Sequence, residues 1–338
     1  MKQSNVIKFA LVALPLGMCF FGVIALSYTF FSPASQVREG GRTLLNSKTI
    51  ITEENLKSWV SRQSNDIGSR PTSDQKKTRI TAKWIESELS EENIGYRPKV
   101  TFLDGKNGNY RNIEVELPGT DKADEIIIVV TCYSSAENCP GANCNGTGVA
   151  ALLASARYFV GTENSRTIRF VACVGKFQTS EGIDGSGIAF LADSYKKTDE
   201  QIIGLIYLDS LGYYTDQLED KMVPANLKGD YQVKGNYLAL VSELASNEFI
   251  EYFHSEFSQS YEMPVREIVL SRDSLADSSK YFASFSGQSY PALQLSDNSI
   301  YRYPHYHRGT DTPDKIDYER LSGVVKSLVL GIDSMLSP

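Results

Sequence analysis

Short apolar runs alternate with helical stretches along the middle of the chain, and this alternation restricts the fold more than any other feature. The runs Glu125 to Val130, Thr167 to Val174 and Ile202 to Leu208 are rich in β-branched residues, as expected for strands buried on both faces. Helical stretches separate them, and the first of these is the Ala-rich segment Val149 to Phe159. Strands and helices that alternate in this way form a sheet with helices on both faces. The sequence therefore predicts an α/β fold with a mixed, largely parallel central sheet flanked by helices.

Three residues with chemically useful side chains lie where these strands are expected to end. Cys132 closely follows the first run, Asp209 follows the third, and Cys144 lies in the loop that leads to the Ala-rich helix. In open α/β sheets, ligands bind near the carboxyl ends of the strands. We therefore expect the functional site at this edge of the sheet.

Two amphipathic helices are predicted ahead of the strands. Leu56, Trp59 and Val60 recur at helical spacing after Thr52, and a second helix extends from about Asp74 to Leu89.

The N-terminal part of the chain contains an apolar segment, Phe9 to Phe31, that carries no charged residue. A helix of this length crosses about 30 Å of hydrocarbon, and the segment is longer than the apolar region of a cleaved signal peptide. We predict a transmembrane signal anchor through which the protein contacts the membrane, with a cleaved secretory peptide as the alternative. The predicted organisation is a cytoplasmic N-terminus at 1–8, the anchor at 9–31, a linker at 32–51 and one soluble domain at 52–338.

The net charge and the cysteine content indicate which partners and which compartment suit the protein. The formal net charge of -7, the pI near 5.2 and the dispersed Lys and Arg residues argue against a nucleic-acid partner. Four of the five cysteines lie beyond the predicted span, an even number that is compatible with disulfides in an oxidising compartment.

Eight segments follow one another in an order that is specific for a known family. They are IGSRPT (67–72), NIEVELPGT (112–120), VVTCYSS (129–135), PGANCNGTGVAALL (140–153), TIRFVAC (167–173), LIYLDSLGYY (205–214), SYPALQLSD (289–297) and PHYHRGTDTPDKIDYERL (304–321). Together they resemble the di-zinc aminopeptidases of metallopeptidase family twenty-eight, from about Thr52 to Ser334. The resemblance implies a zinc-exopeptidase fold and a soluble domain outside the cytoplasm.

The resemblance also implies an altered metal site. In the family two zinc ions share a carboxylate and activate a water between them. Here Cys132 stands at the position of the first histidine ligand, Ser134 at that of the aspartate two residues further on, and Cys144 at that of the bridging aspartate. Asp209 and His307 match retained ligands.

The family's pair of glutamates, one of which accepts the proton from the water, has no counterpart in this sequence. One alignment places Lys176 and Phe177 near the pair, a second places Thr179 and Ser180 there, and a deletion of the pair is a third interpretation. Glu181 is the nearest acid and is the candidate for a general base.

Two further residues are expected to line the pocket. Asp277 in ADSSKYF keeps an aspartate of the family's SDHSPF segment, and Tyr306 precedes His307 in a loop rich in tyrosine.

Three interpretations of this site follow. In the first, the domain is a pseudopeptidase without a cofactor that binds a protein or peptide ligand or forms part of a membrane assembly. In the second, Cys132, Cys144, Asp209 and His307 hold one zinc ion in a closed site, and hydrolase chemistry of the aminopeptidase or cyclase type is kept only if one cysteine stays off the metal and a water takes its place. In the third, Cys132 and Cys144 form a disulfide that closes the old metal pocket.

Overall fold

The computed structural model describes residues 51–106, 108–178, 184–217, 234–243, 247–261, 263–271, 273–274, 281–285 and 290–336. The predicted anchor at 9–31 and most of the predicted linker lie outside these residues, as do Glu181 and Asp277. Within the described ranges, every helix is too short or too polar to cross a bilayer.

An eight-stranded mixed sheet forms the centre of the domain, with the strand order β1-β2-β4-β3-β7-β10-β8-β9. The neighbours β4, β3, β7 and β10 run parallel. At one edge β2 is antiparallel to both β1 and β4, and at the other β8 is antiparallel to β10 but parallel to β9. The strands are β1 (Lys99–Gly105), β2 (Gly108–Leu117), β3 (Lys122–Cys132), β4 (Arg166–Cys173), β7 (Gln201–Leu208), β8 (Leu238–Glu243), β9 (Val265–Leu270) and β10 (Ala292–Ser296). The predicted fold class is confirmed.

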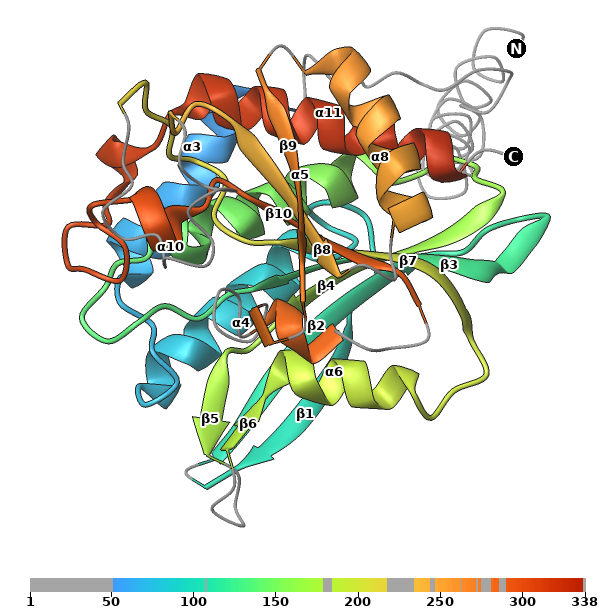
Figure 1. Cartoon of the computed structure of the whole chain (residues 1–338). Coiled ribbons are helices and arrows are strands. Elements are labelled where there is room, and N and C mark those ends of the chain that lie inside the picture. The colour runs from blue at the N-terminus through green and yellow to red at the C-terminus, as the bar shows by residue number, and fades with distance from the viewer. Residues whose placement is uncertain are drawn as a thin grey trace, which may run out of the picture. The chain divides into compact units, whose positions relative to one another are not determined.

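Helices cover both faces of this sheet (Figure 1). One face packs on α3 (Glu53–Ser61), α4 (Gln75–Leu89), α5 (Gly148–Phe159), α8 (Asn247–Ser260) and α11 (Tyr318–Leu336), and the other on α6 (Gly187–Tyr195). The domain also contains short helical segments: η1 (Arg62–Ile67), η2 (Ala142–Thr147), η5 (Phe282–Phe285), α10 (Ser299–Arg302) and η6 (Pro313–Lys315). A small separate hairpin consists of β5 (Lys176–Gln178) and β6 (Asp184–Ser186).

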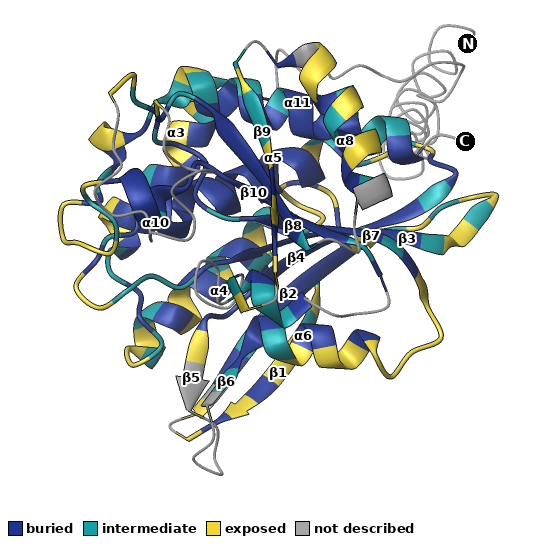
Figure 2. Ribbon diagram, in the orientation of Figure 1, coloured by how far each residue is buried: buried dark blue, intermediate teal, exposed yellow. Residues whose placement is uncertain are grey.

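Strand β3 shows why the apolar runs are continuous rather than alternating. Ile127 and Val129 pack into the larger core beneath α5, whereas Ile126, Ile128 and Val130 pack into the core beneath α6. Because both faces of the central strands are covered, every position needs an apolar side chain. Figure 2 shows the same pattern, with the central strands buried and the outer turns of the helices exposed.

The two predicted N-terminal helices are present, and side chains cap both of them. Thr52 accepts a hydrogen bond from the Asn55 backbone N–H at 3.2 Å, and Asp74 accepts one from that of Lys77 at 3.0 Å. Each cap satisfies a backbone donor that has no partner within the helix.

Both tryptophans of the chain donate their indole N–H to one carboxylate. Trp59 on α3 and Trp84 on α4 lie 3.1 and 3.0 Å from the two oxygens of Glu88. This carboxylate therefore joins two helices that are separate in the sequence.

We expect Glu88→Ala to lower the free energy of unfolding by about 2 kcal/mol, because two partly buried indole donors lose a charged acceptor. Glu88→Gln keeps an acceptor and should lose less. Urea unfolding followed by tryptophan fluorescence measures both, since each fluorophore lies on this contact. Equal stability of Glu88→Ala and the unaltered chain would contradict the assignment.

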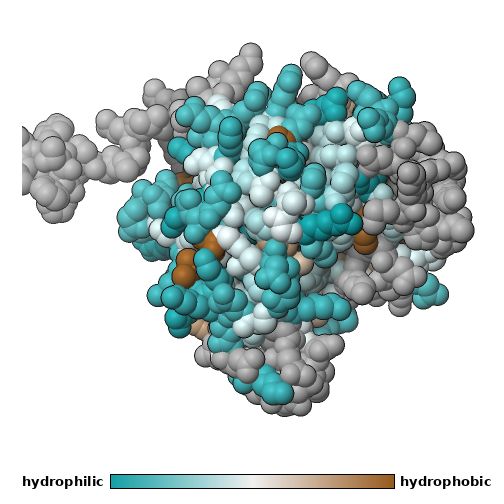
Figure 3. All heavy atoms as spheres, turned by 90° about the vertical axis from the view of Figure 1, so that its left-hand side faces the viewer, coloured by the Kyte–Doolittle hydropathy of each residue, from teal (hydrophilic) through white to brown (hydrophobic). Residues whose placement is uncertain are grey.

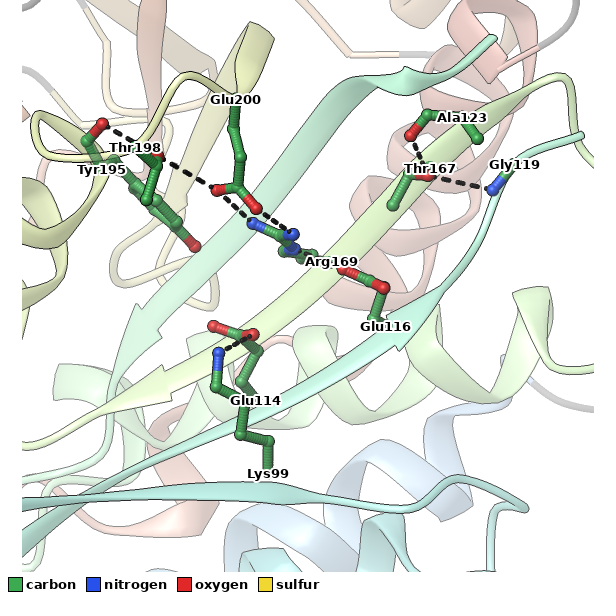
Figure 4. Close-up of polar contacts among 10 residues, drawn as sticks. All are labelled: Lys99, Glu114, Glu116, Gly119, Ala123, Thr167, Arg169, Tyr195, Thr198 and Glu200. Atoms are coloured by element: carbon green, nitrogen blue, oxygen red, sulfur yellow. Dashed lines mark hydrogen bonds and ion pairs between the residues drawn. The ribbon is translucent and has the colours of Figure 1, made fainter. Parts of the chain in front are cut away.

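A network of charges crosses the sheet beside α6 (Figure 4). Arg169 on β4 donates to Glu116 on β2 at 2.6 Å and to both oxygens of Glu200 at 2.9 and 2.6 Å. The hydrogen bond from Arg169 holds the pKa of Glu200 below its ordinary value. The guanidinium is well buried, at 12% exposure, whereas both carboxylates are partly exposed.

Since the pKa of Glu200 is lowered on folding, its contribution to stability is present above the ordinary carboxyl pKa of about 4.3 and is lost as the pH falls through the folded value. We expect Glu200→Gln to cost less than about 1 kcal/mol near neutral pH, because solvent screens the pair. The difference should disappear in acid. Asp193→Asn, which removes an exposed pair with Lys196, is the control and should show no such difference in urea unfolding.

The molecular face seen in Figure 3 is mainly hydrophilic, and strongly hydrophobic residues appear on it singly or in small groups.

Candidate functional site

The parallel strands bring the predicted site residues to one edge of the sheet. Cys132 ends β3, Asp209 follows β7, and Thr131 pairs with Leu208 in register between these strands. Cys173 ends β4 directly beside Cys132. The expected placement of Cys132 and Asp209 is therefore present in the fold.

The turn η2 carries Cys144 over this edge, and a glycine allows it to come close. At Gly148 an added Cβ would lie 2.6 Å from Thr131 Oγ1 and 2.8 Å from the Asp209 carbonyl oxygen. Only a residue without a side chain fits so near to two strand ends. The start of α5 is thereby pressed against β3 and β7.

The side chain of Arg70 holds the loop between β3 and η2 by hydrogen bonds. Its guanidinium is fully buried and donates to three backbone carbonyls: Tyr133 at 2.7 Å, Pro140 at 2.5 Å and Gly141 at 2.9 Å. Burial lowers the pKa of Arg70 to about 10, while the nearby Asp311 carboxylate acts in the opposite direction. The group therefore remains charged at neutral pH.

Asp311 holds the same turn through its backbone donors. Its carboxylate accepts the N–H groups of Asn143 at 2.8 Å and Cys144 at 3.2 Å, and the Tyr303 hydroxyl at 2.9 Å. The residue is fully buried. A buried carboxylate is tolerated only with such donors and a compensating charge, and Arg70 supplies the charge.

Asn143 connects η2 to the segments that follow β7 and β10. Its amide donates to Asp297 at 2.8 Å and to the Ser299 hydroxyl at 2.7 Å, and its carbonyl accepts the Gly212 N–H at 2.9 Å. Burial raises the pKa of Asp297, although these donors oppose the effect. Asn143 thus ties η2 to both of these segments by buried hydrogen bonds.

Asp209 lies among polar neighbours on the α6 side of the edge. It accepts from Ser296 at 3.2 Å and weakly from Gln294 at 3.4 Å. The side chain is partly exposed, yet protein atoms surround the carboxyl closely, and this burial, followed by the charge of Asp297, raises the pKa of Asp209 to about 7.

The thiols of Cys132 and Cys144 form hydrogen bonds with hydroxyl groups. Ser210 donates to Cys144 Sγ at 3.2 Å, and Cys132 shares a hydrogen bond with the Tyr281 hydroxyl. Burial raises the pKa of Cys132 to about 11 and that of Cys144 well above its ordinary value. Both side chains are therefore neutral thiols in this environment.

The disulfide predicted as an alternative is not formed, since all four cysteines of the described domain are free. The Cys144 thiol is directed to Ser210 on the segment after β7, whereas the Cys132 thiol meets Tyr281. Cys132 and Cys144 occupy neighbouring positions at this edge, but their thiols contact different residues.

His307 does not join Asp209 in a metal-binding group. The imidazole is exposed and stacks on the Tyr306 ring with 3.9 Å between centroids. Over the described residues, no three His, Cys, Asp or Glu side chains lie close enough together to hold a metal ion. The single-zinc site predicted from Cys132, Cys144, Asp209 and His307 is therefore not assembled, and the donor set does not fit the zinc that the fold implies.

Tyr281 lies beside Cys132, next to the segment that follows β4. Its hydroxyl accepts the Lys176 N–H at 3.2 Å, and Ser134 accepts the Gly175 N–H at 3.0 Å. Lys176 itself is exposed, and Phe177 lies in β5. Two non-acidic side chains thus hold the backbone at the position where one alignment put the glutamate pair.

Tyr306 is half-buried at the same edge. Burial raises its pKa, and Asp209 and Cys144 add to the effect. Arg70, Asp311 and Tyr281 were not singled out from the sequence, although they lie in the quoted segments IGSRPT, PHYHRGTDTPDKIDYERL and ADSSKYF. Their roles depend on burial, which the motifs did not reveal.

Comparison with known proteins agrees with this geometry. The family model described as peptidase family M28 matches residues 112–330, and the chain belongs to that family. Among curated proteins, the uncharacterized protein YfbL of Escherichia coli (strain K12) is 23% identical over 235 residues, which cover 66% of this chain and 70% of YfbL.

Solved structures with the same fold are zinc-dependent or related enzymes at low sequence identity. The LapA aminopeptidase of Legionella pneumophila has a TM-score of 0.66 at 14% identity, over 90% of this chain and 78% of LapA. The zinc aminopeptidase BSAP of Bacillus subtilis has 0.64 at 12%, over 85% and 96%. A glutaminyl cyclase of Porphyromonas gingivalis has 0.59 at 17%, over 85% and 99%. These likenesses show the fold alone.

We expect Arg70→Met to lower the free energy of unfolding by about 3 kcal/mol or more, because Asp311 then becomes an uncompensated buried charge and three carbonyls lose their donor. Hydrogen exchange should rise in residues 133–147. Arg70→Lys keeps the charge and tests the same site if Arg70→Met fails to fold. Arg62→Met, which removes an exposed pair with Asp66, is the control. Unchanged exchange in both Arg70 variants would contradict this role.

Proposed function

We propose that this member of peptidase family M28 is a membrane-anchored domain outside the cytoplasm that binds a protein or peptide ligand without hydrolysing it. The observation that carries the proposal is the chemistry of the sheet edge. At the positions that match the family's metal ligands, the described residues include two neutral thiols, Cys132 and Cys144, beside the carboxyl of Asp209.

Peptide hydrolysis by a metal pair requires a metal-activated water and a group that accepts its proton. A thiol must lose its proton before it binds a metal. Here burial disfavours the charged forms of Cys132 and Cys144, and it does the same for Asp209. No catalytic step is therefore derived through a metal.

The hydrogen bonds and aromatic side chains of the sheet edge support a role in binding. Arg70 and Asp311 hold the loop and turn by hydrogen bonds that the protein itself supplies. Tyr281 and Tyr306 place aromatic rings beside Asp209 and Cys132. Aromatic rings that also carry a polar group are frequent in recognition surfaces.

The alternative is an active hydrolase or cyclase with one zinc ion. It would need a donor or base from outside the described residues, and Asp277 and Glu181 are the acids that the sequence offers. The membrane anchor at 9–31 and the location outside the cytoplasm are parts of the proposal that rest on the sequence.

We expect the purified full-length chain, supplied with zinc, to hydrolyse aminoacyl anilides and to cyclise N-terminal glutamine no faster than the buffer. Metal analysis after dialysis should find far less than one zinc per chain. A zinc aminopeptidase in the same buffer is the positive control. Stoichiometric zinc together with turnover that Asp209→Ala abolishes would overturn the proposal.

A further inference from the structure

The outer face of α4 combines three cations with an exposed apolar side chain. Lys76, Arg79, Ile80 and Lys83 follow the helical spacing of three and four residues, and all four are exposed, Ile80 at 39%. The opposite face packs into the domain, where it buries Thr78, Thr81, Ala82, Ile85 and Leu89. In Figure 2 exposed and buried residues alternate along this helix.

The acids of α4 do not neutralise this face. Glu86 pairs with Arg111 on β2 at 3.4 Å, and Glu88 accepts the two indole N–H groups. Among the ion pairs of the described residues, none involves Lys76, Arg79 or Lys83. A chain with a net charge of -7 thus keeps one basic helix face without internal compensation.

This combination of side chains fits an anionic lipid surface. Lys and Arg near such a surface are attracted to the phosphates, and an apolar side chain between them can enter the boundary between headgroups and acyl chains. An acidic protein would satisfy the cations equally well. The predicted anchor favours the lipid, because it keeps the domain beside a bilayer.

The chain is long enough for this contact. Residues 32–50 lie between the predicted anchor and the first described residue, and at about 3.3 Å per residue they could reach roughly 60 Å. A compact domain of this size has a radius of gyration of about 19 Å, so a segment of this length can reach from one side of the domain to the other. Tethering therefore does not prevent α4 from meeting the surface.

We propose that the basic face of α4, formed by Lys76, Arg79, Ile80 and Lys83, docks the domain onto bilayers that contain anionic phospholipid. The inference rests on the proposed membrane anchor. Docking would orient the domain on the bilayer and thereby determine which of its other surfaces meet a partner.

The test uses the full-length chain in nanodiscs of phosphatidylcholine, with or without phosphatidylglycerol. An amine-acetylating reagent labels the lysines, and mass spectrometry measures the rate at each site. We expect Lys76 and Lys83 to react at least about fivefold more slowly in the anionic discs, the effect of one basic residue at such a surface. High salt should remove the protection, because it screens the attraction.

Two pairs of charge reversals, each changing the net charge equally, serve as matched variants. Lys76→Glu with Lys83→Glu should make backbone hydrogen exchange of α4 the same in both disc types. Lys196→Glu with Lys197→Glu, near the end of α6, should leave the protection of Lys76 and Lys83 intact. Ile80→Ser should weaken the protection without abolishing it.

Equal labelling of Lys76 and Lys83 in both disc types overturns the proposal. So does protection that arises only when a soluble acidic protein is added, since that result assigns the face to a protein partner. A failure of the proposed anchoring gives a different result, because alkaline carbonate then releases the chain from the discs. That release contradicts the membrane anchor and not the docking face.

Discussion

The buried charges of Arg70 and Asp311 are the constraint on which the candidate site depends. Arg70 gathers the carbonyls of the loop after β3, and Asp311 gathers the amides of η2, so that together they satisfy the polar backbone of one continuous segment. Such groups would be costly to bury alone. Because the two residues come from opposite ends of the domain sequence, these contacts depend on the tertiary fold.

Side chains at the strand ends are held by hydrogen bonds in the same way as this backbone segment. Ser210 and Tyr281 provide hydroxyl partners for Cys144 and Cys132, and the carboxyl of Asp209 is held by Ser296. These contacts are internal to the protein. Among the described residues, this edge of the sheet is therefore organised by ordinary hydrogen bonds.

Much of the fold could be predicted from local patterns. The β-branched runs became β3, β4 and β7 because both faces of the central strands are covered, and Thr52 and Asp74 cap the first two helices as their residue types favour. The order of the quoted segments predicted the family, which the match over residues 112–330 confirms. The site was harder to predict, because the match of Cys132 and Cys144 to family positions does not reveal where their side chains point.

The sequence by itself determined the strands, the helices and the family, since these follow from local periodicity and residue identity. Tertiary structure alone decided the partners. It directed Cys144 to Ser210, stacked His307 on Tyr306, and buried Arg70 and Asp311 where each supports the other. The physical reason is that burial and hydrogen-bond geometry depend on residues far apart in the chain, whereas a motif records only neighbours.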